Sequence, residues 1–118
     1  MTLEICGDAT ALVCSAEGPA LDVAGATDLV GEALSCGAEW VCIPASRLDP
    51  TFFRLRTGVA GEIAQKFANY RLRVAIVGDI GAAVAASSAF RDYVTETNRG
   101  RDLWFVPTAA EFVKRLTS

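Results

Sequence analysis

The segment Leu72–Val77, with the sequence LRVAIV, and the turn Gly78-Asp79-Ile80-Gly81 that follows it decide the fold. Apolar residues fill the segment except at Arg73, which is typical of a strand buried on both faces at the centre of a parallel sheet. The turn ends this strand and leads into a helical pattern, one face of which carries Phe90, Tyr93, Val94 and Thr97. A buried strand that leads into a helix in this way predicts an α/β protein.

The same alternation extends in both directions along the chain. Glu39–Ile43 is a short apolar strand ended by Pro44, and Leu103–Val106 is the last strand. Apolar residues at helical spacing lie before, between and after these strands, and they are Ala26, Leu29, Val30, Ala33 and Leu34, then Ile63, Phe67 and Tyr70, and finally Phe112, Val113 and Leu116. Strands joined by helices run parallel with right-handed crossovers, so we expect the last three strands to be parallel.

Local signals mark where the helices begin and end. Gly37 is a natural stop for the first helix, and Asp49-Pro50 is typical of an N-cap followed by a first helical position. Ser87 or Ser88 can cap a helix start inside the segment that follows the central strand. The final helix is expected to start at Thr108-Ala109-Ala110-Glu111, which has the spacing of a capping box.

The amino-terminal region predicts a hairpin. Leu3–Cys6 and Thr10–Ser15 flank Gly7-Asp8-Ala9, a short polar turn with the glycine that tight hairpins favour. The element order is therefore ββαβαβαβα, in which the hairpin supplies an antiparallel edge to a mixed sheet. We expect residues 1–118 to form a single small α/β sandwich.

Composition limits the classes of function. The chain has 118 residues, with 11 basic and 14 acidic side chains, a formal net charge of −3 and no histidine. The basic excess that marks most nucleic-acid-binding proteins is absent, so we expect no nucleic acid partner. Without histidine, the chain cannot build a histidine-based catalytic triad or a metal site that needs imidazole.

The cysteines and the amino terminus indicate the compartment. Cys6, Cys14 and Cys42 lie in short apolar runs, where cysteine acts as a small buried hydrophobe, and Cys36 lies at the end of a helix. Their spacing contains no CxxC pair, so we expect no metal, and reduced thiols fit a reducing compartment. Met1–Glu4 lacks the features of a signal peptide, and no apolar run reaches the ~18 residues of a membrane span. We therefore expect a cytoplasmic protein without a membrane partner.

Open α/β sheets bind ligands at the carboxyl ends of their parallel strands. Loops that meet this description are Pro44–Pro50, Gly78–Gly81 and Pro107-Thr108, and the candidate ligand-binding residues are Ser46, Asp49, Arg54, Arg56, Thr57, Gly58 and Asp79. Amide groups at a helix start with arginines nearby would bind an anionic small molecule. The region from Arg47 to Arg73 supports this, because it holds five arginines and one lysine against two acids. The alternative is that Asp49 and Thr57 only cap helices and that the arginines are solvated.

A second candidate surface lies on the helix expected between Thr57-Gly58 and about Asn69. Glu62 and Lys66 stand at i and i+4 there, the favourable order for a helix ion pair. Together with residues near the end of the following helix, the candidate interface residues are Glu62, Gln65, Lys66, Asn69, Glu96, Asn98 and Arg99. These polar side chains would form a surface for a protein partner or a homodimer. The alternative is a solvated face.

Catalytic chemistry has little support in this sequence. Carboxylates, serines and thiols are present, but no spacing places a nucleophile beside a base. Neither a GxGxxG nor a GxxxxGK[ST] motif is present, so nucleotide binding has no motif support and we expect no cofactor. A non-catalytic protein is the favoured class, and an enzyme is the weaker one.

Several motifs, taken in order, resemble one bacterial family. They are Leu48-Asp49-Pro50, Phe53 and Leu55, Thr57–Glu62 with Gln65–Phe67 and Tyr70, Ala75–Asp79, and Glu96–Gly100 with Phe105-Val106. With them, essentially the whole chain resembles the bacterial domain-of-unknown-function family 4180. The resemblance implies a small bacterial protein with no established activity, so it assigns no catalytic residue to this chain.

The element order is also similar to that of STAS domains, which are named after sulfate transporters and anti-sigma factor antagonists. That likeness implies a regulatory protein in which a phosphorylated serine or threonine after a central strand controls partner binding. Ser46 and Thr57 lie in the corresponding region, but the Asp-Ser-Gly type motif of that family is missing. The STAS-like architecture is therefore an analogy of fold alone.

The sequence leaves two functions open. The first is a non-catalytic regulatory module that binds a protein through its strand-end loops and the face of Glu62, Gln65 and Lys66. The second is a binder of an anionic small molecule, or a small enzyme acting on one, at the carboxyl ends of the parallel strands. A deep cavity lined by the candidate arginines would favour the second function, and a flat surface would favour the first.

Overall fold

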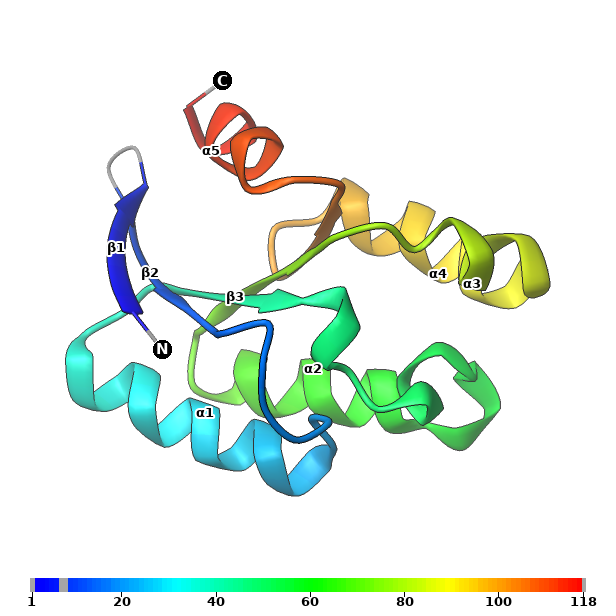
Figure 1. The fold of residues 1–118 in the computed structure, drawn as a ribbon, viewed down its shortest axis with the longest axis horizontal. Coiled ribbons are helices and arrows are strands. Elements are labelled where there is room, and N and C mark those ends of the chain that lie inside the picture. Colours follow the sequence, from blue (N-terminus) through cyan, green and yellow to red (C-terminus); the bar gives the residue numbers. More distant parts are fainter. Residues whose placement is uncertain (1, 7–8, 118) are drawn as a thin grey trace.

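The computed structural model describes residues 2–6 and 9–117, and a mixed five-stranded sheet organises them (Figure 1). Its strands, in spatial order, are β1 (Thr2–Cys6), β2 (Ala9–Val13), β3 (Trp40–Pro44), β4 (Arg73–Val77) and β5 (Leu103–Val106). β1 pairs antiparallel with β2, whereas the pairs β2–β3, β3–β4 and β4–β5 are parallel. The predicted α/β class, the antiparallel hairpin and the parallel last three strands are confirmed.

Helices connect the parallel strands. They are α1 (Val23–Cys36), α2 (Val59–Asn69), α3 (Gly81–Ala86) and α4 (Ser88–Arg99), and α5 (Ala109–Thr117) follows the last strand. Three short 3-10 helices lie between β3 and α2, and they are η1 (Ala45–Arg47), η2 (Pro50–Phe53) and η3 (Leu55–Thr57). The predicted internal cap is confirmed at Ser87, where the hydroxyl oxygen accepts the N–H of Phe90 (3.1 Å) and separates α3 from α4.

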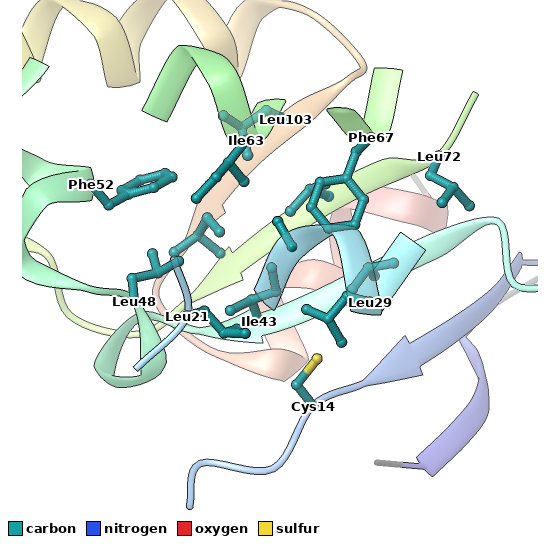
Figure 2. Close-up of a cluster of buried hydrophobic side chains, with 14 of the residues drawn as sticks. Cys14, Leu21, Leu29, Ile43, Leu48, Phe52, Ile63, Phe67, Leu72 and Leu103 are labelled. Atoms are coloured by element: carbon teal, nitrogen blue, oxygen red, sulfur yellow. The ribbon is translucent and has the colours of Figure 1, made fainter. Parts of the chain in front are cut away.

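Most of the core lies on one face of the sheet. The strands follow one another in chain order, and right-handed crossovers then place α1, α2 and α4 on the same face. Side chains alternate along each strand, so Ile43 and Ile76 point to this face and are buried there with Phe90. Figure 2 shows Leu29 of α1 and Phe67 of α2 among the side chains that meet in this core.

The opposite face has a smaller core under α5. Phe112 is buried there, with ring centroids 5.1 Å from Trp40 and 6.3 Å from Trp104. The remaining buried members are small or aliphatic, and they are Ala11, Cys42, Ala75 and Val106. Two cations cover the tryptophans from outside: the Arg73 guanidinium lies 5.9 Å from the ring of Trp40, and that of Arg115 lies 4.0 Å from the ring of Trp104.

The observed elements differ from the predicted ones at a few positions. β2 ends at Val13 instead of Ser15, and the carbonyl oxygen of Ser15 accepts a hydrogen bond from Arg47. The predicted turn residues Gly7 and Asp8 lie outside the described residues. After Asp49, the expected helical turns are 3-10 helices, in which Phe52, Arg54, Thr57 and Gly58 donate backbone N–H groups three residues back.

The burial of Cys14 and Cys42 agrees with their positions in apolar runs of the sequence. Cys14 and Cys42 are buried, and Cys36 at the end of α1 is exposed. The side chain of Cys6 lies outside the description. No helix among the described residues is long and apolar enough to cross a bilayer.

Candidate functional site

The loops at the carboxyl ends of β3 and β4 lie against each other. Gly78, directly after β4, has a φ of +140°. A Cβ atom placed on it would lie 3.2 Å from the Cβ of Ala45, the first residue after β3. A side chain at position 78 would therefore force the two loops apart, and glycine lets the segment after β3 and the segment after β4 form one continuous edge.

An open cavity of about 600 Å³ lies between these two segments. The segment after β3 contributes Pro50, Phe53, Arg54, Leu55 and Arg56, and the segment after β4 contributes Ala83, Ala86, Ser87 and Ala89. Apart from Ser87 and the two arginines, the side chains are apolar. This cavity lies at the edge where open α/β sheets bind ligands, and we refer to it as the arginine cavity.

The two cations of the arginine cavity make no hydrogen bond or ion pair among the described residues. They are the guanidinium groups of Arg54 and Arg56, and both residues are exposed. Leu55 lies between them in the sequence and is half-buried against the main core. Two unpaired guanidinium groups beside apolar walls can donate up to five N–H groups each to an anion.

The start of α4 adds to this positive end of the cavity. Ser87 and Ala89 line the cavity, and they belong to the cap and the first turn of the 12-residue helix α4. The first N–H groups of a helix have no acceptor inside the helix, and the helix dipole places partial positive charge there. The sequence predicts a cap at Ser87 or Ser88 but does not connect it with Arg54 and Arg56, because that connection depends on how β3 and β4 pair.

Asp49 and Thr57, two of the candidate ligand residues, hold the loop together. Asp49 Oδ1 accepts the N–H of Thr51 (3.0 Å) and its hydroxyl (2.7 Å). These hydrogen bonds from Thr51, with the nearby charge of Arg54 as a smaller contribution, hold the pKa of Asp49 below its ordinary value. The Thr57 hydroxyl lies 2.7 Å from the carbonyl oxygen of Arg54, and its oxygen accepts the N–H of Val59. Both residues therefore shape the arginine-bearing loop.

The other candidate ligand residues are not among the described residues that line the arginine cavity. Ser46 is exposed on η1, and Gly58 is exposed between η3 and α2. Asp79 Oδ1 accepts the N–H of Gly81 (2.8 Å), and Asp79 lines a separate cavity of about 250 Å³ that reaches Pro107. The structure thus brings Arg54 and Arg56 together in one cavity and places Asp79 in another.

Some of the candidate interface residues line a groove on the surface, whereas Asn98 makes contacts inside the protein. Gln65 and Glu96 both line a groove of about 310 Å³ between α2 and α4. Each has a partner on its own helix, because Gln65 donates to Asn69 (2.7 Å) and Glu96 lies 3.8 Å from Arg99. The two ion pairs within residues 2–6 and 9–117 are Arg91–Asp92 and Glu96–Arg99, so the ion pair expected from the spacing of Glu62 and Lys66 does not form.

Asn98 has a role inside the protein. Its Oδ1 accepts the N–H of Phe105 (2.7 Å), and its Nδ2 donates to the carbonyl oxygen of Phe105 (3.3 Å). In this arrangement the amide side chain takes the place of a neighbouring strand at the outer edge of β5. Spacing alone could not distinguish this role from an interface role, since the contact joins α4 to a strand seven residues later in the sequence.

The described lining of the arginine cavity holds two guanidinium groups and one hydroxyl, and no carboxylate or thiol. Elsewhere in the described residues, no three acidic or cysteine side chains gather in a way that could hold a metal ion.

Comparisons with known proteins place the chain in a family without adding a function. No curated protein matches it, and neither does any solved structure, so the likeness to STAS domains gains no support. The family model described as "Domain of unknown function (DUF4180)" matches residues 7–116. With the match spanning nearly all of its 118 residues, the chain belongs to this family of proteins of unknown function.

Proposed function

We propose that the protein binds a small organic anion in the arginine cavity. The observation that carries this proposal is the pair of unpaired guanidinium groups, those of Arg54 and Arg56, at a cavity whose other walls are almost wholly apolar. A small anion with an apolar part fits this lining, because it supplies both a counter-charge for the guanidinium groups and an apolar contact for the other walls.

The chemistry of the lining suggests the class of ligand. A phosphate or carboxylate group would lie against the guanidinium groups and the start of α4, and an apolar body would contact Phe53, Leu55 and the alanines of α3. A volume of about 600 Å³ at an open site is within the range of ordinary small-molecule pockets. The ligand is therefore expected to combine one anionic group with a hydrocarbon or aromatic portion.

Protein binding through the α2–α4 groove is the alternative, and the arrangement of charges favours the ligand. Gln65 and Glu96 at that groove already have partners, whereas the side chains of Arg54 and Arg56 make no hydrogen bond or ion pair among the described residues. Polar groups that are already satisfied gain less from a partner than groups that are not.

A titration with phenyl phosphate tests the proposal. We expect phenyl phosphate to bind more tightly than inorganic phosphate, which lacks the apolar part, and more tightly than benzyl alcohol, which lacks the charge. Loss of a charge-assisted hydrogen bond costs about 1.5–3 kcal/mol, so Arg54→Gln and Arg56→Gln should each weaken binding of phenyl phosphate about ten-fold or more. Isothermal titration calorimetry measures the three affinities and the effect of each variant.

A matched control is Arg101→Gln, which removes an exposed arginine that lines the α2–α4 groove. It should bind phenyl phosphate like the unchanged protein. Equal losses in Arg54→Gln and Arg101→Gln would show a non-specific charge effect and would overturn the proposal. Absence of binding by phenyl phosphate and inorganic phosphate would also overturn it.

A further inference from the structure

The small core under α5 leaves part of its sheet face open. α5 packs against β4 and β5, and beside it a groove of about 190 Å³ runs toward β1. We refer to it as the α5 groove, and its lining consists of Glu4 from β1, Val13 from β2, Cys42 and Pro44 from β3, Val77 from β4, and Ala109, Phe112 and Val113 from α5. It lies on the face of the sheet opposite to the one that α2 and α4 cover.

The size of the α5 groove and the nature of its walls define what fits. An apolar cavity of about 150 Å³ is large enough to hold benzene, so one of about 190 Å³ holds a single ring or a short hydrocarbon chain. Val113 is 36% exposed although it is a large apolar residue, and it forms part of the wall. Covering this wall with an apolar ligand would remove that surface from water.

One carboxylate faces this apolar space. In the hairpin, Glu4 pairs with Ala11, and residues directly opposite each other in a sheet share a face. Ala11 belongs to the core under α5, so Glu4 lies on the same face and is the one charged residue that lines the α5 groove among the described residues. Its carboxylate makes no hydrogen bond or ion pair with any residue that the structure describes.

The basic residues of α5 do not supply a counter-charge to Glu4. Arg115 lies over Trp104 of β5 and donates to the carbonyl oxygen of Asn98, on the side away from β1. Lys114 is exposed and does not line the groove. The α5 groove therefore combines an apolar interior with an uncompensated negative charge at its β1 wall, the reverse of the charge in the arginine cavity.

We propose that the α5 groove binds a small hydrophobic ammonium ion, with the hydrocarbon part between the sheet and Phe112 and the ammonium group on the carboxylate of Glu4. The inference is independent of the anion site proposed in the arginine cavity. Charge decides the class of ligand: an anion of the same size would meet the carboxylate without compensation, and a neutral molecule would gain only the apolar contact.

Benzylamine is a suitable probe, since it joins one aromatic ring to one ammonium group. Two-dimensional NMR of the labelled protein reports on the site directly, because Phe112 contacts both Trp40 and Trp104 and the indole N–H signals of these tryptophans are resolved from the backbone. We expect benzylamine to shift these signals in a saturable way, with benzyl alcohol binding at least ten-fold more weakly and benzoate not at all.

Two variants and one control make the test specific. Glu4→Gln keeps the size of the side chain and should weaken benzylamine binding about ten-fold while binding of benzyl alcohol is unchanged. Ala109→Leu fills the groove and should abolish binding of both. Glu111→Gln removes a carboxylate from α5 that does not line the groove, and it should bind benzylamine normally. The proposal fails if benzylamine causes no saturable shift, if benzoate binds as well as benzylamine, or if Glu4→Gln and Glu111→Gln behave alike.

Discussion

Arg47 shows how one side chain fixes a long loop. Its Nε donates to the carbonyl oxygen of Pro19 (3.0 Å), and its Nη1 lies within hydrogen-bond distance of the carbonyl oxygens of Ser15 (2.9 Å) and Glu17 (3.2 Å). The backbone completes the connection, because the N–H of Leu21 donates to the carbonyl oxygen of Arg47. The segment that leads from β2 into α1 is thereby joined to the loop that carries the arginine cavity.

Replacing this guanidinium tests its importance for stability. Arg47→Lys keeps the charge but loses the planar fork that reaches several carbonyl oxygens at once. We expect the free energy of unfolding to fall by about 1–3 kcal/mol, the range for losing hydrogen bonds to a charged group. Urea denaturation measures it, and hydrogen exchange at the amide of Leu21 should become faster. The control is Arg101→Lys, at an exposed arginine whose side chain makes no hydrogen bond or ion pair among the described residues. Equal stabilities of the two variants would contradict this role of Arg47.

At the scale of elements, α1 and α2 end in the same backbone motif with different residues. After α1, Gly37 donates to the carbonyl oxygen of Leu34 and Ala38 to that of Ala33; after α2, the corresponding bonds run from Arg71 to Ala68 and from Leu72 to Phe67. This is the Schellman motif, whose left-handed position is usually glycine. Gly37 has a φ of +72° and Arg71 a φ of +59°, so α2 places an arginine where α1 has glycine.

The difference between the two helix ends predicts that exchanging glycine and arginine has opposite effects on stability at the two positions. A left-handed conformation costs a residue with a Cβ roughly 1–2 kcal/mol, and the greater freedom of glycine in the unfolded chain cancels part of the gain. Arg71→Gly should therefore raise the free energy of unfolding by about 0.5–1 kcal/mol, and Gly37→Arg should lower it by a similar or larger amount. Thermal and urea denaturation of both variants measure the change. Destabilisation by Arg71→Gly would mean that its side chain, and not its backbone conformation, matters.

The helix ends also show what the sequence could predict. Caps at Gly37, Asp49 and Ser87 depend on residues a few positions apart, and each is confirmed by a hydrogen bond in the structure. The role of Asn98 could not be predicted in this way. Its amide satisfies the outer N–H and carbonyl groups of Phe105, which protects the edge of β5 from pairing with another strand. Such a contact depends on how α4 packs beside β5, which no local pattern encodes.

At the scale of the whole molecule, the candidate site was predictable in part. The position of the loops at the carboxyl ends of the strands followed from the expected parallel sheet, and Arg54 and Arg56 followed from the local excess of positive charge. The far wall of the arginine cavity did not, because α3 consists of glycine, alanine and valine and carries no chemical signal of its own. The α5 groove could not be predicted either, since it needs both the hairpin register that places Glu4 and the packing of α5.

Stability as a function of pH depends on groups from several parts of the molecule. The pKa of Asp49 is lowered in the folded protein, so its contribution to stability is present above about pH 4, the ordinary range of aspartate, and is lost as the pH falls through the lowered value. Burial raises the pKa of the Cys14 thiol, which the charge of Arg47 opposes in part, and burial also raises the pKa of the Tyr93 hydroxyl. Each of these two groups loses its proton at a lower pH in the unfolded chain than in the folded protein. Its contribution to the free energy of unfolding is therefore complete at lower pH, and that contribution falls as the pH rises above about 8.5 for the thiol and about 10 for the phenol.

These signs predict a stability profile with a plateau between acid and alkaline losses. The chain has no histidine, so no imidazole titrates between them. We expect the urea midpoint to be nearly constant from about pH 5 to pH 8 and to fall on both sides. The double variant Cys14→Ala with Tyr93→Phe should lower the plateau slightly but make the alkaline fall shallower, and Asp49→Asn should make the acid fall shallower and leave the alkaline side unchanged. If the double variant loses stability above pH 8.5 as steeply as the unchanged protein, burial of these two groups is not what limits the fold in alkaline solution.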